Sequence, residues 1–122
     1  MSGPLNEVAF TAAFLAQAKA EGMTEVDLAA LVQILAADPE AGDLIVGSGG
    51  CRKLRLGGRG KGKSGGYRVV TFFARRAMPV YVLAALSKGS RETFSDGEVK
   101  AMAALAKRIL AALPPRDAKG GR

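Results

Sequence analysis

A cluster of Lys and Arg residues carries the clearest chemical signal in this sequence. Seven of the eighteen basic residues lie between positions 51 and 70. They are Arg52, Lys53, Arg55, Arg59, Lys61, Lys63 and Arg68. The chain has no acidic residue between Asp43 and Glu92, so this charge has no counterpart nearby in the sequence. Because a field of one sign attracts polyanions and speeds their arrival, we expect this segment to bind a polyanion.

The net charge of +7 is unevenly distributed along the 122 residues. Residues 1–43 hold seven acids and one Lys, residues 44–91 hold eleven bases and no acid, and residues 92–122 are nearly balanced. Such concentration of positive charge is typical of nucleic-acid binding. The alternative is a merely solvated cationic surface, although a solvated face usually mixes both signs.

Cys51 is the only cysteine, and the chain has no histidine. A lone cysteine excludes an intramolecular disulfide and a cysteine-based metal cluster. The lack of histidine removes the commonest base and the commonest metal ligand. We expect Cys51 to be a small buried apolar residue rather than a reactive thiol, and we expect no metal ion and no cofactor.

Residues 57–64 match the nucleotide-binding pattern GxxxxGK[ST]. In such a loop a helix follows, and its amino terminus binds phosphate. Here Gly65-Gly66 is followed by Tyr-Arg-Val-Val-Thr-Phe-Phe, which favours a strand. No acid is available on the next predicted strand to hold Mg²⁺. We therefore interpret the match as a coincidence of a Gly/Lys loop.

Two helices are predicted before the basic cluster. The first covers residues 6–20 with Asn6 as its cap. The second covers residues 24–38, where Thr24 and Asp27 form a capping box and a proline follows the last residue. The expected apolar face of the first helix includes Val8, Phe10, Ala12, Phe14 and Leu15, and that of the second includes Leu28, Leu31, Val32 and Leu35.

Three strands are predicted in the middle of the chain, at residues 52–56, 67–74 and 80–86. In the first, alternation places Lys53 and Arg55 on one face and Arg52 with the leucines on the other. The second has no polar face, which indicates a strand covered on both sides, and Arg68 is its only charge. Consecutive strands joined by short connections should pair antiparallel.

The remaining segments are a connector and a last helix. The connector covers residues 40–50, and its apolar residues Leu44, Ile45 and Val46 are expected to turn toward the core. Ser95 and Glu98 form a capping box that opens a helix ending at two prolines, Pro114 and Pro115.

The length and an apolar content of 48% predict one folded domain over residues 1–122, with loose tails at 1–5 and 116–122. The fold class is α+β: a small antiparallel sheet of three to four strands packed against two N-terminal helices and one C-terminal helix. The sequence shows no secretory signal pattern and no apolar run near the ~20 residues that span a bilayer. We therefore expect a cytoplasmic protein without membrane contact.

Four segments carry a family likeness. They read Asp-Pro-Glu-Ala-Gly-Asp-Leu-Ile at 38–45, Gly-Ser-Gly-Gly at 47–50, Arg-Lys-Leu-Arg at 52–55 and Gly-Lys-Gly-Lys-Ser-Gly-Gly-Tyr-Arg-Val at 60–69. Their combination closely resembles the RelE/HigB-type toxins of bacterial toxin–antitoxin systems, which belong to the RelE/ParE superfamily. The resemblance implies a RelE-like fold, metal-independent cleavage of mRNA in the ribosomal decoding site, and neutralisation by a cognate antitoxin protein.

The resemblance also assigns positions. Lys53 and Arg55 match the basic pair on the first core strand, Arg68 matches the arginine of the Gly-Gly-Tyr-Arg segment, and Lys88 or Arg91 matches the basic position after the last strand. With the charge cluster, it nominates as catalytic residues Lys53, Arg55, Lys63 and Arg68. The nominated RNA-binding residues are Arg52, Arg59, Lys61, Lys88 and Arg91.

Two features depart from the family pattern. Many relatives have an aromatic residue near the end of the last strand, where Leu86 and Ser87 stand here, and Tyr81 lies too early to replace it. Relatives often begin with a short strand, whereas residues 1–20 favour a helix.

The residue chemistry agrees with the implied activity. RNA can be cut without a metal ion because its 2′-OH is a nucleophile adjacent to the phosphate. The guanidinium groups of Arg55 and Arg68 suit bidentate contact with phosphate oxygens. Crowded like charges disfavour a protonated lysine, which makes Lys53 or Lys63 the candidate base. With no histidine or nearby carboxylate, such a site needs its substrate aligned by the ribosome.

The competing hypothesis is a non-catalytic member of the superfamily that binds nucleic acid or poisons gyrase, and a plain interaction domain is a third. A pure binder would not need four cations on one face, which favours the enzyme. Arg68 on a buried strand carries a desolvation cost unless an anion meets it. A substrate phosphate would meet it in the enzyme, and a distant Glu of the first two helices is the structural alternative.

Overall fold

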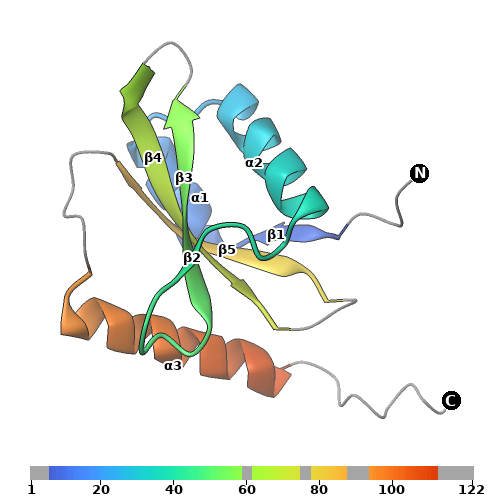
Figure 1. Ribbon diagram of the computed structural model, residues 1–122, viewed down its shortest axis with the longest axis vertical. Coiled ribbons are helices and arrows are strands. Elements are labelled where there is room, and N and C mark those ends of the chain that lie inside the picture. The colour runs from blue at the N-terminus through green and yellow to red at the C-terminus, as the bar shows by residue number, and fades with distance from the viewer. Residues whose placement is uncertain (1–5, 59–61, 75–77, 88–93, 113–122) are drawn as a thin grey trace, which may run out of the picture.

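The computed structural model describes residues 6–58, 62–74, 78–87 and 94–112. In this part of the chain a five-stranded sheet has helices on both faces (Figure 1). The elements in chain order are β1 (Val8–Phe10), α1 (Ala12–Ala20), α2 (Glu25–Ala37), β2 (Asp43–Leu44), β3 (Cys51–Gly58), β4 (Gly62–Phe73), β5 (Val80–Ser87) and α3 (Asp96–Ala112).

The strands lie in the order β1-β5-β4-β3-β2. The pairs β3–β4 and β4–β5 are antiparallel, as predicted for consecutive strands. The pair β2–β3 is also antiparallel, and β1 pairs parallel with β5. The α+β class with three helices is confirmed. The sheet has five strands rather than the three to four expected, because β1 and β2 are too short to stand out in the sequence.

The predicted helical start at Asn6 is wrong. The first helix begins after Thr11, whose side-chain oxygen accepts a hydrogen bond from the Phe14 backbone N–H at 3.1 Å. Phe14 and Ala18 form the buried face of α1, whereas Leu15, expected on that face, is exposed. The shorter helix is set by the threonine cap, which binds one of the donors left open at a helix start.

Before Thr11 the chain forms β1 instead of a helical turn. Val8 pairs with Val80 and Phe10 with Val82, and the Asn6 side chain donates to the Met78 carbonyl at 3.0 Å. These partners lie some seventy residues away in the chain. Non-local pairing therefore overrides the local helical pattern at this end.

The other two helix starts are confirmed. Thr24 and Asp27 form the predicted capping box of α2, with reciprocal distances of 2.9 and 3.2 Å. Ser95 and Glu98 form that of α3, at 2.7 and 3.1 Å. No helix within the described ranges is both long enough and apolar enough to span a bilayer.

Two hydrophobic cores lie on opposite faces of the sheet. The first core lies between the sheet and the helices α1 and α2. Its buried members are Phe14, Ala18, Leu31, Leu35, Leu56, Val69, Val80, Val82 and Ala85. The buried members of the core against α3 are Cys51, Val70, Phe72, Leu83 and Ala106. Each large apolar side chain buried in this way contributes about 1.5–3 kcal/mol.

The connector before β3 differs from the expectation. Leu44 and Val46 are exposed rather than turned inward, and of the three apolar residues only Ile45 packs against the α3-side core. Gly42 lies so close to β3 that a Cβ there would come within 2.5 Å of the Lys53 carbonyl oxygen. Because β2 pairs only with Arg52 and Lys53, no described strand pairs with the rest of β3 on that side.

The glycine-rich segment continues the hairpin rather than forming a long loop. β3 runs to Gly58 and β4 starts at Gly62, with a register shift between Leu56 and Gly58. The backbone from Gly62 onward is a strand, as predicted, and not the helix that a nucleotide-binding loop requires.

Thr71 has an unusual position in the core. The pairing of β4 with β5 shifts register between Val70 and Thr71, and Thr71 is completely buried. Within the described residues, Thr71 Oγ1 is the one buried side-chain oxygen or nitrogen atom without a hydrogen-bond partner. We expect Thr71→Val to raise the free energy of unfolding by about 1 kcal/mol, because a buried unpaired hydroxyl costs stability. Urea unfolding measures this change. Thr71→Ser, which keeps the hydroxyl and loses the methyl group, should be less stable than wild type, and a destabilised valine variant would contradict the prediction.

Cys51 is completely buried, as expected. Its backbone N–H donates to Ser48 Oγ at 2.9 Å, and burial raises the pKa of its thiol above the ordinary 9.0, with Ser48 opposing the shift only in part. At pH values just above 9.0, the thiol of the native protein thus keeps its proton, whereas the thiol of the unfolded chain has mostly released it. Its contribution to stability is complete below pH 9.0 and declines above it.

We therefore expect the stability advantage of wild type over Cys51→Ala to shrink as the pH rises above 9.0. Denaturant unfolding of both proteins at a series of pH values on either side of this point tests it. Because the alanine variant shares every other titrating group, a difference that stays constant across the series would show that the thiol ionises equally in both states.

Candidate functional site

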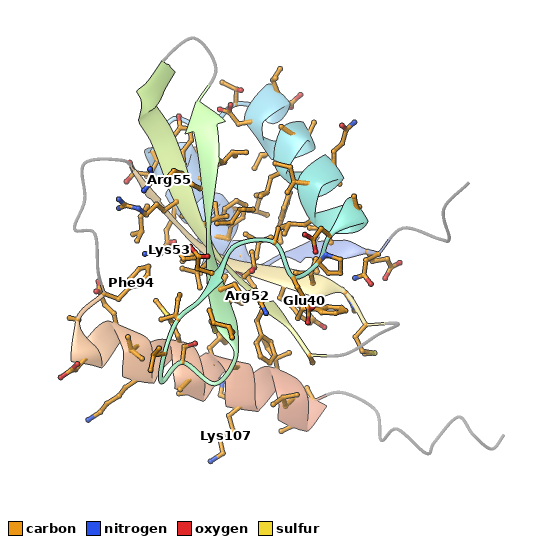
Figure 2. The ribbon with its side chains drawn as sticks, in the orientation of Figure 1. Glu40, Arg52, Lys53, Arg55, Phe94 and Lys107 are labelled. Atoms are coloured by element: carbon orange, nitrogen blue, oxygen red, sulfur yellow. The ribbon has the colours of Figure 1, made fainter. Side chains whose placement is uncertain are left out.

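Three of the four residues nominated as catalytic lie on one face of the sheet. Lys53 and Arg55 alternate along β3, and Arg68 stands on β4 directly opposite Arg55. This is the face that α3 covers, because Cys51 on the same side of β3 packs against α3. Figure 2 shows Lys53 next to Phe94, just before α3 begins, and Arg55 farther along the hairpin from α3. We call Lys53, Arg55 and Arg68 the cationic face.

The members of the cationic face differ in exposure. Arg55 is exposed, Lys53 is half-buried and Arg68 is only 4% exposed. Two like charges directly opposite on neighbouring strands destabilise a sheet. No acidic residue occurs in β3, β4 or β5. The three central strands therefore carry only positive charge, although Asp43 of β2 pairs with Lys53, and such a concentration of one sign is expected of an anion-binding surface.

A close backbone contact sets this geometry. A Cβ placed on Gly66 would come within 2.6 Å of the Leu56 carbonyl oxygen, so only glycine fits here. Leu56 pairs with Tyr67, the residue before Arg68. The second glycine of the Gly-Gly-Tyr-Arg segment thus lets β3 and β4 approach closely enough to place Arg68 beside Arg55.

The other nominated residues are not all at this face. Arg52 points to the opposite face of β3, where its Nη1 donates to the Gly42 carbonyl at 3.1 Å. Lys63 belongs to β4, but its side chain lies outside the described part of the chain. Four further nominated residues lie outside the described residues, namely Arg59, Lys61, Lys88 and Arg91.

The end of β5 has no aromatic residue, in agreement with the departure noted from the sequence. Leu86 is the residue that pairs with Arg68. Tyr81 pairs with Phe72 instead and belongs to the α3-side core. It lies away from the Arg55–Arg68 pair, so it does not fill the position.

Sequence reasoning missed Phe94. The Lys53 ammonium nitrogen lies 6.0 Å from the centre of the Phe94 ring, the outer limit of a cation–π contact. Phe94 is half-buried and packs against the α3-side core. The available signal was its place just before the helix cap Ser95, where an apolar residue commonly packs back on the first turn.

Metal ligands do not gather in this part of the molecule. Within the described residues no three His, Cys, Asp or Glu side chains come together as a potential metal site. The cationic face instead provides positive charge, from one ammonium group and two planar guanidinium groups.

Comparison with known families identifies the family of this chain. The model of the family described as the RelE toxin of the RelE / RelB toxin–antitoxin system matches residues 7–115. The match includes every described element, from β1 to α3. The chain therefore belongs to the RelE toxin family, and as the toxin of a toxin–antitoxin system it has an antitoxin as its implied partner.

Proposed function

We propose that this toxin is a metal-independent, ribosome-dependent mRNA endonuclease, and that the cationic face binds the scissile phosphate. The observation that carries the proposal is the placement of Lys53, Arg55 and Arg68 on one face of two adjacent strands. Family membership supports the same activity.

The reaction uses the nucleophile that RNA itself provides. The 2′-OH loses its proton and attacks the adjacent phosphorus, the bond from phosphorus to the 5′-oxygen breaks, and that oxygen takes up a proton. The products are a 2′,3′-cyclic phosphate and a 5′-OH end. Negative charge grows on the phosphate oxygens during this step, so fixed cations lower the barrier.

The residues divide this work by exposure and chemistry. Arg55 is exposed and meets the phosphate with its planar donors. Arg68 is 4% exposed, and its charge acts where water is largely excluded and electrostatic interactions are stronger. Lys53 or Lys63, in its neutral form, accepts the proton of the 2′-OH, and the lysine protonated in this way can give a proton to the 5′-oxygen. The ribosome supplies the alignment of mRNA that a site without histidine needs.

The antitoxin would inhibit such a site by covering it. An acidic segment would be attracted to the cationic face and would exclude the RNA. Antitoxin and substrate would then compete for the same cationic face.

We expect Arg68→Ala to reduce mRNA cleavage on ribosomes by roughly 10²–10³-fold, the usual cost of losing one transition-state donor. Arg68→Lys should not restore activity, because a point charge cannot reproduce the planar fork. The assay is cleavage of a ribosome-bound mRNA by purified toxin, with thermal melts run in parallel. A single 2′-deoxynucleotide at the cleaved position should abolish the cut. Full activity in a strongly destabilised Arg68→Ala would instead assign Arg68 to the fold.

Arg55 and Arg52 provide a matched pair for RNA binding. They lie on the same strand but on opposite faces, and only Arg55 belongs to the cationic face. Binding to single-stranded RNA should weaken with salt by a log–log slope of about −0.7 per neutralised phosphate. We expect Arg55→Gln to reduce the magnitude of the slope by about that amount. Fluorescence anisotropy over a salt series measures it. Equal slopes for Arg55→Gln and Arg52→Gln would contradict the proposed face.

A further inference from the structure

Asp43 is the one acidic residue in the five described strands. It is the first residue of β2 and lies directly across from Lys53 of β3. Because residues directly opposite on antiparallel strands have Cβ atoms about 4.5–5.5 Å apart, the Asp43 carboxylate is within reach of the Lys53 ammonium group. The short outer strand therefore brings one negative charge to a sheet whose central strands carry only positive charge.

The neighbouring pair shows which face of the sheet Asp43 belongs to. The backbone N–H of Ile45 donates to the Cys51 carbonyl at 2.9 Å, and both residues pack in the α3-side core. Side chains alternate along a strand, so Asp43 starts from the same side as Ile45, and Lys53 starts from the same side as Cys51. The carboxylate and the ammonium group therefore share the side of the sheet on which the cationic face lies.

Two contacts of Gly42 hold the beginning of β2 in place. Arg52 Nη1 donates to the Gly42 carbonyl at 3.1 Å. A Cβ on Gly42 would come within 2.5 Å of the Lys53 carbonyl oxygen, and its φ of +99° also favours glycine. The residue before Asp43 thus lies directly against β3, which fixes the point from which the carboxylate projects.

We propose that Asp43 is a positioning residue that acts through Lys53. In the protein without RNA, its carboxylate is the counter-ion of the Lys53 ammonium group and keeps that group on the cationic face. A phosphate that binds Lys53 replaces the carboxylate, so the loss of one attraction offsets part of the other. The inference rests on the proposed RNA binding and adds a limit to it: RNA is held less tightly than the positive charge alone would allow.

Variants of Asp43 test this limit. We expect Asp43→Asn to bind a labelled oligouridylate roughly 1.5- to 5-fold more tightly than wild type, the range typical of one exposed ion pair. Asp43→Glu keeps the charge and should bind as wild type does. Fluorescence anisotropy at a fixed salt concentration measures both affinities. Unchanged affinity in Asp43→Asn would overturn the proposal.

Glu40→Gln is the matched control. Glu40 is an exposed acid in the turn after α2, and Figure 2 shows it well apart from Lys53. Its neutralisation measures the general effect of removing one negative charge from the protein. In a Lys53→Gln background, the effect of Asp43→Asn should fall to that of Glu40→Gln, because the carboxylate has lost the group through which it acts. Equal gains in affinity for the two variants in the wild-type background would contradict a specific role of Asp43.

A double-mutant cycle without RNA separates this proposal from the proposed function. Urea unfolding of wild type, Asp43→Asn, Lys53→Gln and the double variant should show a favourable coupling of roughly 1.5- to 5-fold in the folding equilibrium constant. The same cycle with Arg55→Gln should show a weaker coupling, because Arg55 pairs with Arg68 and not with Asp43. If Asp43 and Lys53 do not couple, the counter-ion is overturned while RNA binding can stand. If they couple but the wild-type protein does not bind oligouridylate, the counter-ion stands and the proposed function fails.

Discussion

The register between β3 and β4 is the constraint on which the rest of this molecule depends. It pairs Cys51 with Phe72, Lys53 with Val70 and Arg55 with Arg68. Side chains alternate strictly along a strand, so a slip of one residue would send the cations into the α1–α2 core and the leucines into water. The apolar residues on both faces therefore hold the guanidinium groups in place, and the repulsion between those groups is tolerated because the rest of the hairpin fixes the pairing.

The two faces of the sheet are covered differently. One face is covered by α1 and α2 with a mainly aliphatic core, while the other is divided between the α3 core and the cationic face. The capping box at Ser95 fixes where α3 begins, and Phe94 lies one residue before it. The capping box that fixes the beginning of α3 therefore also helps to place Phe94 beside Lys53 of the cationic face.

Much of this could be predicted from the sequence, and the exceptions have physical causes. Local signals predicted the strands around Leu54, Val70 and Val82 and the caps at Thr24 and Ser95, because alternation and capping depend on neighbouring residues. Local signals could not predict β1 or the exposure of Leu44, since these depend on partners distant in the chain. Within the site, the alternation of side chains along a strand correctly predicted that Arg52 and Arg55 lie on opposite faces. The proximity of Phe94 to Lys53 could not be predicted in this way, because it depends on how α3 packs.

The short β2 leaves much of the outer edge of β3 without a strand partner in the described part of the chain. An open edge offers its backbone groups to a second chain, and proteins commonly protect such edges with charge. Lys53 pairs with Asp43 of β2, whereas Arg55 stands on the open part of β3, so a charge that is proposed to bind RNA would also disfavour edge-to-edge association of copies of the protein. The solubility of the protein would thereby depend on a side chain that is also proposed to bind RNA. Neutralising this charge with a small polyanion or with concentrated salt removes the protection, and solubility then depends on whether a partner covers the edge.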